Sequence, residues 1–222
     1  MARLYAIVFW LFLMASGANA TLLQGAEPLF QARAPAATGP SLFAGPQGLF
    51  APITPRPPAP SPVGDRIGAL LSLIAEAEAG AGGYDAVIHA ATIRPPRVPT
   101  ELTLGEIYTW IDATPSQHHA IGRYQFIPPT LRRVANALNY GPETQFTPAV
   151  QDALALVLLE EGGLTEFEGG TLDRLQFMRN LSRIWAGLPL PNGRSYYQGY
   201  AGNRATITWA RFEAGMAAIW PM

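Results

Sequence analysis

The sequence predicts an α+β protein that is mainly α, with a single domain following a non-periodic N-terminal segment. From residue 64 onward, apolar residues recur at helical spacing between glycine and proline breaks. One short stretch, 84–93, has an extended pattern and predicts a small β-hairpin region. Before residue 64, prolines recur without any helical or strand period.

The first 20 residues predict a secretion signal peptide. Arg3 supplies a positive charge, residues 4–14 are apolar, and Ala18-Asn19-Ala20 matches a small-x-small cleavage site. The apolar run is shorter than the about 20 residues that a membrane span needs. We therefore expect cleavage after Ala20, no stable membrane insertion afterwards, and a periplasmic or otherwise exported location in the cell envelope. An uncleaved N-terminal anchor is the alternative.

Residues 21–63 predict a linker rich in proline, alanine and glycine. Proline fixes φ and removes a backbone donor, so this stretch is expected to be an extended tether. Leu42-Phe43 and Leu49-Phe50 suggest a docking motif for a partner in an envelope complex. Scattered apolar residues in a linker are the simpler interpretation.

The domain is expected to span residues 64–222. Its first helix has Asp65 as a candidate cap, carries Ile67, Leu71 and Ile74 on one face, and ends at the glycines near residue 80. After the extended segment, the patterns predict helices over 102–111, 128–138, 147–159, 171–185 and 203–218. The Thr147-Pro148 pair is a cap followed by a proline, which is typical of a helix start.

Composition excludes several classes of function. The net charge is −1, so no nucleic-acid partner is expected. The absence of cysteine excludes a thiol nucleophile and a zinc–thiolate site. The chain has three histidines, which are few candidates for a serine–histidine triad or a multi-histidine metal site. We therefore expect no metal and no cofactor.

Glu78 occupies an unusual position for a glutamate. It continues the series Ile67, Leu71, Ile74 and so lies on the apolar face of its helix, whereas Glu76 points elsewhere, to solvent. The helix C-terminus and partial burial both disfavour its ionised form and raise its pKa. A general acid for glycoside cleavage needs that property. A glutamate at a frayed helix end, paired with an arginine, is the alternative.

Five segments, in order, resemble the lysozyme-like lytic transglycosylase family of the bacteriophage lambda endolysin. They are the helix ending in Glu76-Ala77-Glu78, Gly83-Tyr84-Asp85-Ala86-Val87, Gly122-Arg123-Tyr124-Gln125, Gln151-Asp152-Ala153, and Ile184-Trp185-Ala186-Gly187-Leu188-Pro189 with Tyr197-Gln198 after it. The resemblance covers residues 64 to about 215. It implies a lysozyme-like fold with a catalytic cleft, Glu78 as the catalytic acid, and peptidoglycan glycan strands as the partner.

The resemblance also implies substrate-binding roles for Tyr84, Tyr124, Gln125, Tyr197 and Gln198. Gln125 offers both a donor and an acceptor to an N-acetyl group or a sugar hydroxyl, although it can equally tie down a loop. The tyrosine rings suit the apolar faces of sugars, although packing is the more common role of such rings.

The reaction type depends on a second carboxylate. A retaining hydrolase needs a nucleophile about 5–5.5 Å from the acid, and an inverting one needs a base about 6.5–9.5 Å away. Asp85 is the acidic residue that soon follows Glu78, but an aspartate there commonly serves a turn. The resemblance implies chemistry by one glutamate and a 1,6-anhydro product. A muramidase using Glu78 and Asp85, or a non-catalytic wall-binding module, are the alternatives.

Overall fold

The computed structural model describes residues 62–200 and 202–221, which all belong to one compact unit, Pro57–Met222. The expected signal peptide, 1–20, and nearly all of the expected linker, 21–63, lie outside the described residues. None of the described helices is long and apolar enough to cross a membrane.

The described chain is built from seven α-helices and two 3-10 helices. In chain order they are α1 (Pro62–Glu78), η1 (Gly80–Asp85), η2 (Pro99–Glu101), α2 (Leu104–Ala113), α3 (Pro128–Ala137), α4 (Pro148–Glu161), α5 (Leu164–Glu168), α6 (Arg174–Ile184) and α7 (Trp209–Ile219). The expectation of a mainly helical domain is confirmed.

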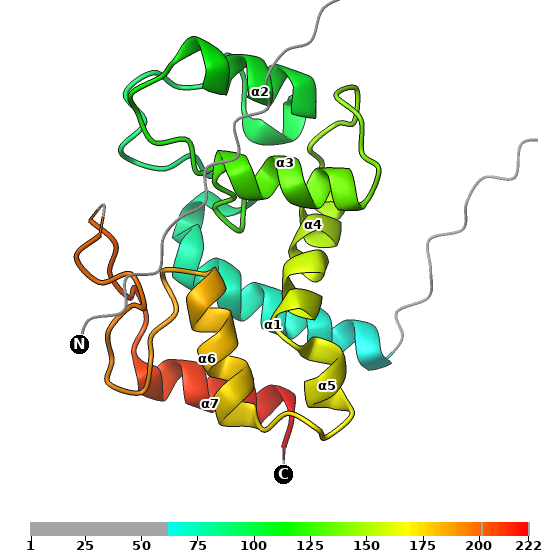
Figure 1. The fold of residues 1–222 in the computed structure, drawn as a ribbon, viewed down its shortest axis with the longest axis vertical. Helices are drawn as coiled ribbons and strands as arrows, with labels where there is room; N and C mark the ends of the chain where they lie inside the picture. The colour runs from blue at the N-terminus through cyan, green and yellow to red at the C-terminus, as the bar shows by residue number, and fades with distance from the viewer. Residues whose placement is uncertain (1–61, 201, 222) are drawn as a thin grey trace, which may run out of the picture. The chain divides into compact units, whose positions relative to one another are not determined.

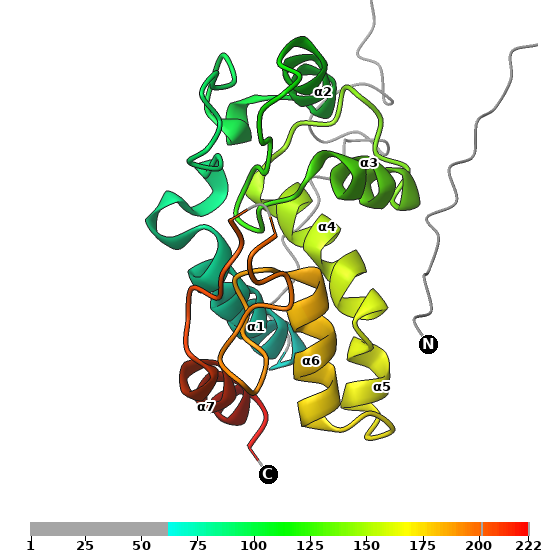
Figure 2. The same ribbon diagram turned by 60° about the vertical axis from the view of Figure 1, so that its left-hand side comes forward.

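The helices form two groups joined by α4 (Figures 1 and 2). One group holds α2 and α3, and α3 packs on α4. The other holds α1, α5, α6 and α7, with α1 packed on α7 and α5 contacting both α4 and α6. Helix α1 ends at Glu78, where the chain passes into η1, so this residue lies at the junction between a long helix and an irregular segment.

The core runs through both groups. The large aromatic side chains Phe126, Phe146, Phe177 and Phe212 are fully buried, together with the buried leucines of α1 and α4. Burying a side chain of this size contributes about 1.5–3 kcal/mol. The core therefore fixes the end of α1 and the start of α4, the two places that hold most of the candidate site.

Side-chain caps set several helix starts. Thr147 caps α4 by accepting from Val150 N–H, as expected, and Thr103 forms a reciprocal capping box with Glu106 at α2. Asp173 and Thr208 cap α6 and α7 in the same way. The expected starts at residues 171 and 203 are therefore too early.

Two further expectations about helices are wrong. Helix α1 begins at Pro62, so Asp65 is a residue of the helix and not its cap. Helix α5 was not expected, because its five residues are too few to show a period. Its end is closed by Thr171 and Leu172, whose backbone N–H groups donate to Glu166 O at 2.9 and 3.0 Å. Those two residues are therefore turn and not helix.

The expected β-hairpin region is not confirmed, because no strand forms among the described residues. Val87, Ile121 and Phe126 instead make isolated antiparallel bridges, Val87 with Ile121 and Ile121 with Phe126. Backbone bonds flank the first bridge, from Ile88 N–H to Ala120 O and from Gly122 N–H to Ala86 O. Most of the stretch read as extended is used by η1 and by turns, so too few residues remain to extend a ladder.

Candidate active site

Glu78 is the last residue of α1 and is partly buried, while Glu76, two residues earlier, is exposed. Gly187 N–H donates to Oε1 of Glu78 over 2.8 Å. Burial raises the pKa of the Glu78 carboxyl to about 7, and the hydrogen bond from Gly187 opposes that rise. The carboxyl can therefore hold a proton near neutral pH and also release it, which acid–base catalysis requires.

A second layer of contacts holds Gly187 in place. Its carbonyl accepts from Thr206 N–H at 3.0 Å, and the Thr206 hydroxyl donates to Ala77 O, one residue before Glu78. A Cβ at Gly187 would lie 2.4 Å from Ala77 O and 2.9 Å from Ala77 C. Only glycine lets the two backbones approach this closely, so the donor to Glu78 depends on this residue.

The other carboxylates near Glu78 in sequence have partners. Glu76 forms a two-point ion pair with Arg211 on α7, which confirms that it points away from the core. Asp85 accepts through Oδ1 from both the backbone N–H and the hydroxyl of Thr100, at 2.9 and 2.7 Å. Asp85 thus anchors η2, which contains Thr100, and this contact spans more of the chain than the local turn role expected for it.

The Gly-Arg-Tyr-Gln motif forms a tight turn between Ile121 and Phe126, which exchange two backbone hydrogen bonds. Gly122 has a φ of 78°, and a Cβ there would lie 2.5 Å from Gln151 Oε1, so both conformation and space demand glycine. Gln125 also has a positive φ, 46°, and its Nε2 donates to Gly122 O at 2.9 Å. In this structure Gln125 therefore holds its own turn together, which the sequence analysis gave as the alternative to sugar binding.

Two of the expected site tyrosines share one carboxylate. The Tyr84 hydroxyl donates to both oxygens of Asp152 at 2.9 and 3.0 Å, and the Tyr124 hydroxyl donates to Oδ1 at 2.5 Å. Burial and the bonds to Asp152 raise the pKa of both hydroxyls. Tyr124 is 1% exposed, so its ring packs in the core and offers no face to a sugar. Tyr84 is half-buried, with the Arg123 guanidinium 4.7 Å from its ring centre.

Gln151, next to Asp152 on α4, is fully buried and fully bonded. Its Nε2 donates to Tyr84 O and Phe146 O, and its Oε1 accepts from Arg123 N–H at 2.8 Å. It therefore fastens the end of η1 to the turn of the motif. The sequence analysis did not predict this linking role of Gln151. Two adjacent polar residues in a strongly apolar helix were the signal that could have indicated it.

Tyr197 and Gln198 lie in the loop after α6. The Tyr197 hydroxyl donates to Arg183 O at 2.6 Å, and its ring is half-buried against Tyr196. The side chain of Gln198 is exposed, and its backbone N–H donates to Ser195 O. Ser195 in turn donates to Ala186 O at 2.6 Å, so this loop is bonded to the segment that carries Gly187.

The structure thus brings the expected residues together as two bonded sets. Glu78 joins the 186–197 loop through Gly187, and Tyr84 joins the Gly-Arg-Tyr-Gln turn through Asp152 and Gln151. Sequence reasoning missed the donor from Gly187, because it lies 109 residues from Glu78 and no local pattern connects the two.

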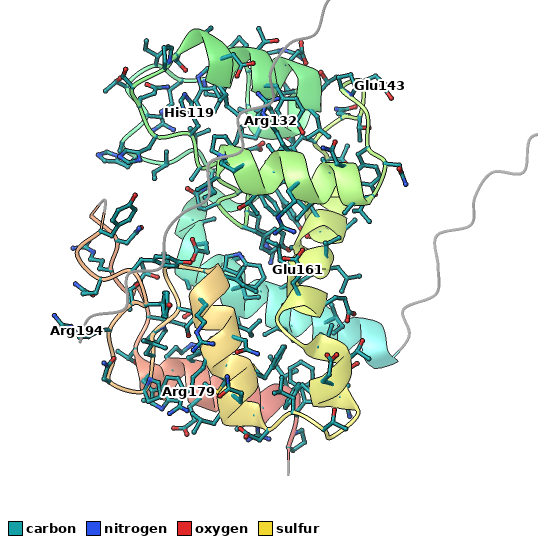
Figure 3. All side chains as sticks on the ribbon, viewed as in Figure 1. His119, Arg132, Glu143, Glu161, Arg179 and Arg194 are labelled. Carbon is teal, nitrogen blue, oxygen red and sulfur yellow. The ribbon has the colours of Figure 1, made fainter. Side chains whose placement is uncertain are left out.

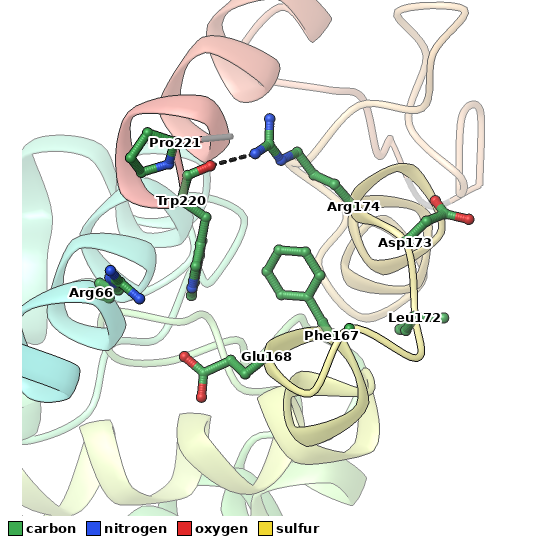
Figure 4. Close-up of a pocket in the computed structure, with 9 residues that line it drawn as sticks. Arg66, Phe167, Glu168, Leu172, Asp173, Arg174, Trp220 and Pro221 are labelled. Atoms are coloured by element: carbon green, nitrogen blue, oxygen red, sulfur yellow. Dashed lines mark hydrogen bonds between the residues drawn. The ribbon is translucent and has the colours of Figure 1, made fainter.

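One pocket in the described residues lies far from Glu78. It has a volume of about 590 Å³ and is lined by Arg66, the α5–α6 turn and the C-terminal Trp220 and Pro221 (Figure 4). Arg66 and Glu78 are twelve residues apart on α1, which is about 18 Å of helix. A second pocket, of about 410 Å³, lies between α6 and the loop that follows it.

Among the described residues, no group of three or more histidine, aspartate or glutamate side chains is arranged to hold a metal ion. His119, labelled in Figure 3, is buried against Trp110 and bonds through Nε2 to the Thr114 hydroxyl at 2.8 Å. Its environment is that of a packed core histidine.

Comparisons with known proteins identify a family that matches this chain. The family model described as Endolysin matches residues 69–213. No curated protein matches the chain. One similar solved structure is that of bacteriophage lambda lysozyme complexed with a chitohexasaccharide, at 20% identity and a TM-score of 0.42, covering 70% of this chain and 92% of that one.

The family match covers well over half of the 222 residues. It includes the C-terminal half of α1 with Glu78, the Gly-Arg-Tyr-Gln turn, the polar pair on α4 and the loop that carries Gly187. The chain therefore belongs to the endolysin family of cell-wall-lytic proteins.

Proposed function

We propose that this chain is an exported peptidoglycan lytic transglycosylase, which cleaves the MurNAc–GlcNAc bond with Glu78 as its single acid–base residue. The observation that carries the proposal is the Glu78 carboxyl itself, partly buried, with a pKa of about 7 and a backbone donor on one oxygen. A proton held on a carboxyl near neutral pH is what the departing sugar oxygen needs.

The hydrogen bond from Gly187 fixes the orientation of the acid. Because Oε1 accepts from the backbone N–H, the proton of the neutral carboxyl is carried on Oε2. Among the described residues no hydrogen bond is made by Oε2, so this oxygen is free to give its proton. A backbone donor is more rigid than a side chain, which reduces the reorganisation needed during proton transfer.

The reaction proceeds in two proton transfers through the same oxygen. Glu78 first gives its proton to the glycosidic oxygen, the C1–O bond breaks, and GlcNAc leaves with a free 4-hydroxyl. The Glu78 carboxylate then takes the proton from the C6 hydroxyl of the same MurNAc while O6 attacks C1. The product is a 1,6-anhydro sugar, no water is consumed, and Glu78 is again protonated.

The bonding of the neighbouring acids supports a mechanism with one carboxylate. Asp85 uses its Oδ1 to hold both donors of Thr100, and Asp152 accepts from two tyrosine hydroxyls. Recruiting either one as a nucleophile or base would break these contacts. Glu76 is paired with Arg211 on the surface.

The product decides between transglycosylase and muramidase. Sacculi digested with the purified protein are expected to release muropeptides that lack the mass of one water relative to those released by a hydrolytic muramidase. Borohydride should leave the anhydro ends unreduced, whereas the hydrolase products in a parallel digest gain two hydrogens. Reducing MurNAc ends as the main product would establish hydrolysis, and no release at all would favour the non-catalytic wall-binding module.

Asp85→Asn is expected to retain most of the cleavage activity. Asparagine keeps an Oδ1 acceptor for Thr100, so the anchor stays while the carboxylate charge is lost. Initial rates on sacculi, with circular dichroism to verify folding, measure the effect. A folded Asp85→Asn protein with less than about one hundredth of the wild-type rate would instead assign Asp85 as the second carboxylate.

Export is the part of the proposal that rests on the sequence of the first 20 residues. Mature protein from the native host is expected to begin at Thr21 and to be recovered in the soluble fraction outside the inner membrane. Edman sequencing of the purified protein provides the measurement, with Ala20→Arg as a variant whose cleavage should be blocked. Finding residue 1 or 2 at the N-terminus of membrane-bound wild-type protein would show that the segment is retained as an anchor.

A further inference from the structure

The pocket between α6 and the following loop is lined on one side by a polar stripe. Gln176, Arg179 and Arg183 are spaced three and four residues apart on α6, so they share one face of the helix (Figure 3 labels Arg179). Opposite them the pocket is lined by Leu190, Pro191, Asn192 and Tyr196.

The two arginines concentrate positive charge in this pocket. Both are exposed, and neither has a carboxylate within 4 Å in the described chain, whereas Arg97, Arg132, Arg133 and Arg211 do. Like charges four residues apart destabilise a helix slightly. An anion bound between them would remove that repulsion.

An aromatic ring borders the same pocket. The Arg183 guanidinium lies 5.7 Å from the ring centre of Tyr196, which is 51% exposed. Guanidinium groups bind carboxylates through paired hydrogen bonds, and an exposed tyrosine ring packs on aliphatic chain beside them. The lining therefore suits a ligand with a carboxylate on a short, partly apolar chain.

The pocket is connected to the catalytic glutamate through one short segment. Leu190 is three residues after Gly187, a span of at most about 11 Å, and Gly187 N–H lies 2.8 Å from Glu78 Oε1. The loop is held by the Pro189–Ser195 bridge and by the bond from the Tyr197 hydroxyl to Arg183 O. A group attached to a sugar at Glu78, or to a sugar one disaccharide away, can reach it.

We propose that this pocket is a subsite for the free carboxylates of the stem peptides of peptidoglycan, with Arg179 and Arg183 as its binding residues. The inference rests on the proposed function. In intact peptidoglycan the lactyl group of MurNAc is consumed in an amide, so the sugar chain is uncharged there and the stem peptides carry the negative charge. The subsite thus distinguishes peptidoglycan from neutral chitin-type glycans.

Binding can be measured without turnover in a Glu78→Gln background, which leaves the glycan intact. The probes are short glycan strands with their stem peptides and the same strands with the peptide carboxylates converted to amides. Isothermal titration of the Glu78→Gln protein is expected to show about tenfold weaker binding of the amidated strands. Adding Arg179→Gln and Arg183→Gln should weaken binding of the native strands by a similar factor and leave that of the amidated strands unchanged.

Arg132→Gln with Arg133→Gln is the control for net charge, because it also removes two positive charges, from α3, where Arg133 is exposed and Arg132 is half-buried. This control should bind native strands as the parent does. An equal loss in the control, or undiminished binding of native strands by the α6 variant, would overturn the subsite. Cleavage assays on protein that keeps Glu78 then separate the two proposals. If anhydro products form but the arginine substitutions do not weaken binding, only the subsite is refuted. If the arginine substitutions weaken binding but no cleavage occurs, only the catalytic function is refuted.

Discussion

Replacing Glu78 with glutamine is expected to lower the rate of peptidoglycan cleavage by about 10²–10⁴-fold, the usual contribution of a general acid–base group. Glutamine retains an Oε1 acceptor for the Gly187 N–H but has no proton of suitable acidity to give. Rates of soluble muropeptide release from sacculi measure the loss. Glu76→Gln is the matched control, since Glu76 is on the same helix, exposed and paired with Arg211, and its rate should stay close to wild type.

The same substitution should stabilise the protein at high pH. The folded-state pKa of about 7 exceeds the ordinary value of 4.5, so the folded chain binds the proton more tightly than the unfolded chain. Wild-type stability therefore falls as pH rises from about 4.5 to 7, by at most about 3.5 kcal/mol, because each pH unit between the two pKa values is worth about 1.4 kcal/mol. Glu78→Gln removes this loss.

Urea denaturation at pH 4 and pH 8 tests that expectation. The free energies of unfolding of wild type and Glu78→Gln should be similar at pH 4, and the variant should be more stable at pH 8. A variant that is less stable than wild type at pH 8 would show that the ionised carboxylate is satisfied in the folded protein. In that case the acid role, which depends on the raised pKa, would be lost with it.

Gly187→Ala is expected to reduce both stability and activity. The added Cβ would lie 2.4 Å from Ala77 O and 2.9 Å from Ala77 C, and these are backbone atoms of the helix that carries Glu78. Relieving such a contact requires one backbone to move, at about 1–3 kcal/mol for overpacking. The movement also takes the N–H away from Glu78 Oε1, so cleavage should fall well beyond the fraction of protein that unfolds.

Gly68→Ala provides the control for this change. Gly68 is an exposed residue of the same helix, and nothing lies within 4 Å of a Cβ placed there. Alanine should stabilise the helix by about 0.5–1 kcal/mol and leave the rate unchanged. Thermal melts and sacculus assays on both variants are the measurements; a fully active, fully stable Gly187→Ala would contradict the close approach of Gly187 to α1.

Local chemistry in the sequence predicted those parts of the fold that depend on near neighbours. The cap at Thr147 and the helix after it follow from residues within one turn, and the side of α1 that Glu78 occupies follows from spacing alone. The start of α7 could not be foreseen, because residues before Thr208 have helical spacing but are held by Thr206 against Gly187.

The expected ring-stacking role of Tyr124 shows the same limit within the site. A tyrosine in a glycine-containing turn looks accessible in the sequence, yet its hydroxyl bonds to Asp152, 28 residues later, and its ring packs beside Phe126. The Gly-Arg-Tyr-Gln motif therefore predicted where the site lies. The direction of its side chains depends on partners that are distant in the sequence, such as Asp152.

The contact between Glu78 and Gly187 has a consequence for the newly made protein. The ribosome completes α1 long before it adds Gly187, 109 residues later, and the Thr206 that holds Gly187 comes later still. A nascent chain therefore has its acid but not the neighbour that orients it. On the proposed function, cleaving ability is therefore expected only after the chain has closed on itself, and truncated products lacking α6 and α7 are expected to be inert toward peptidoglycan.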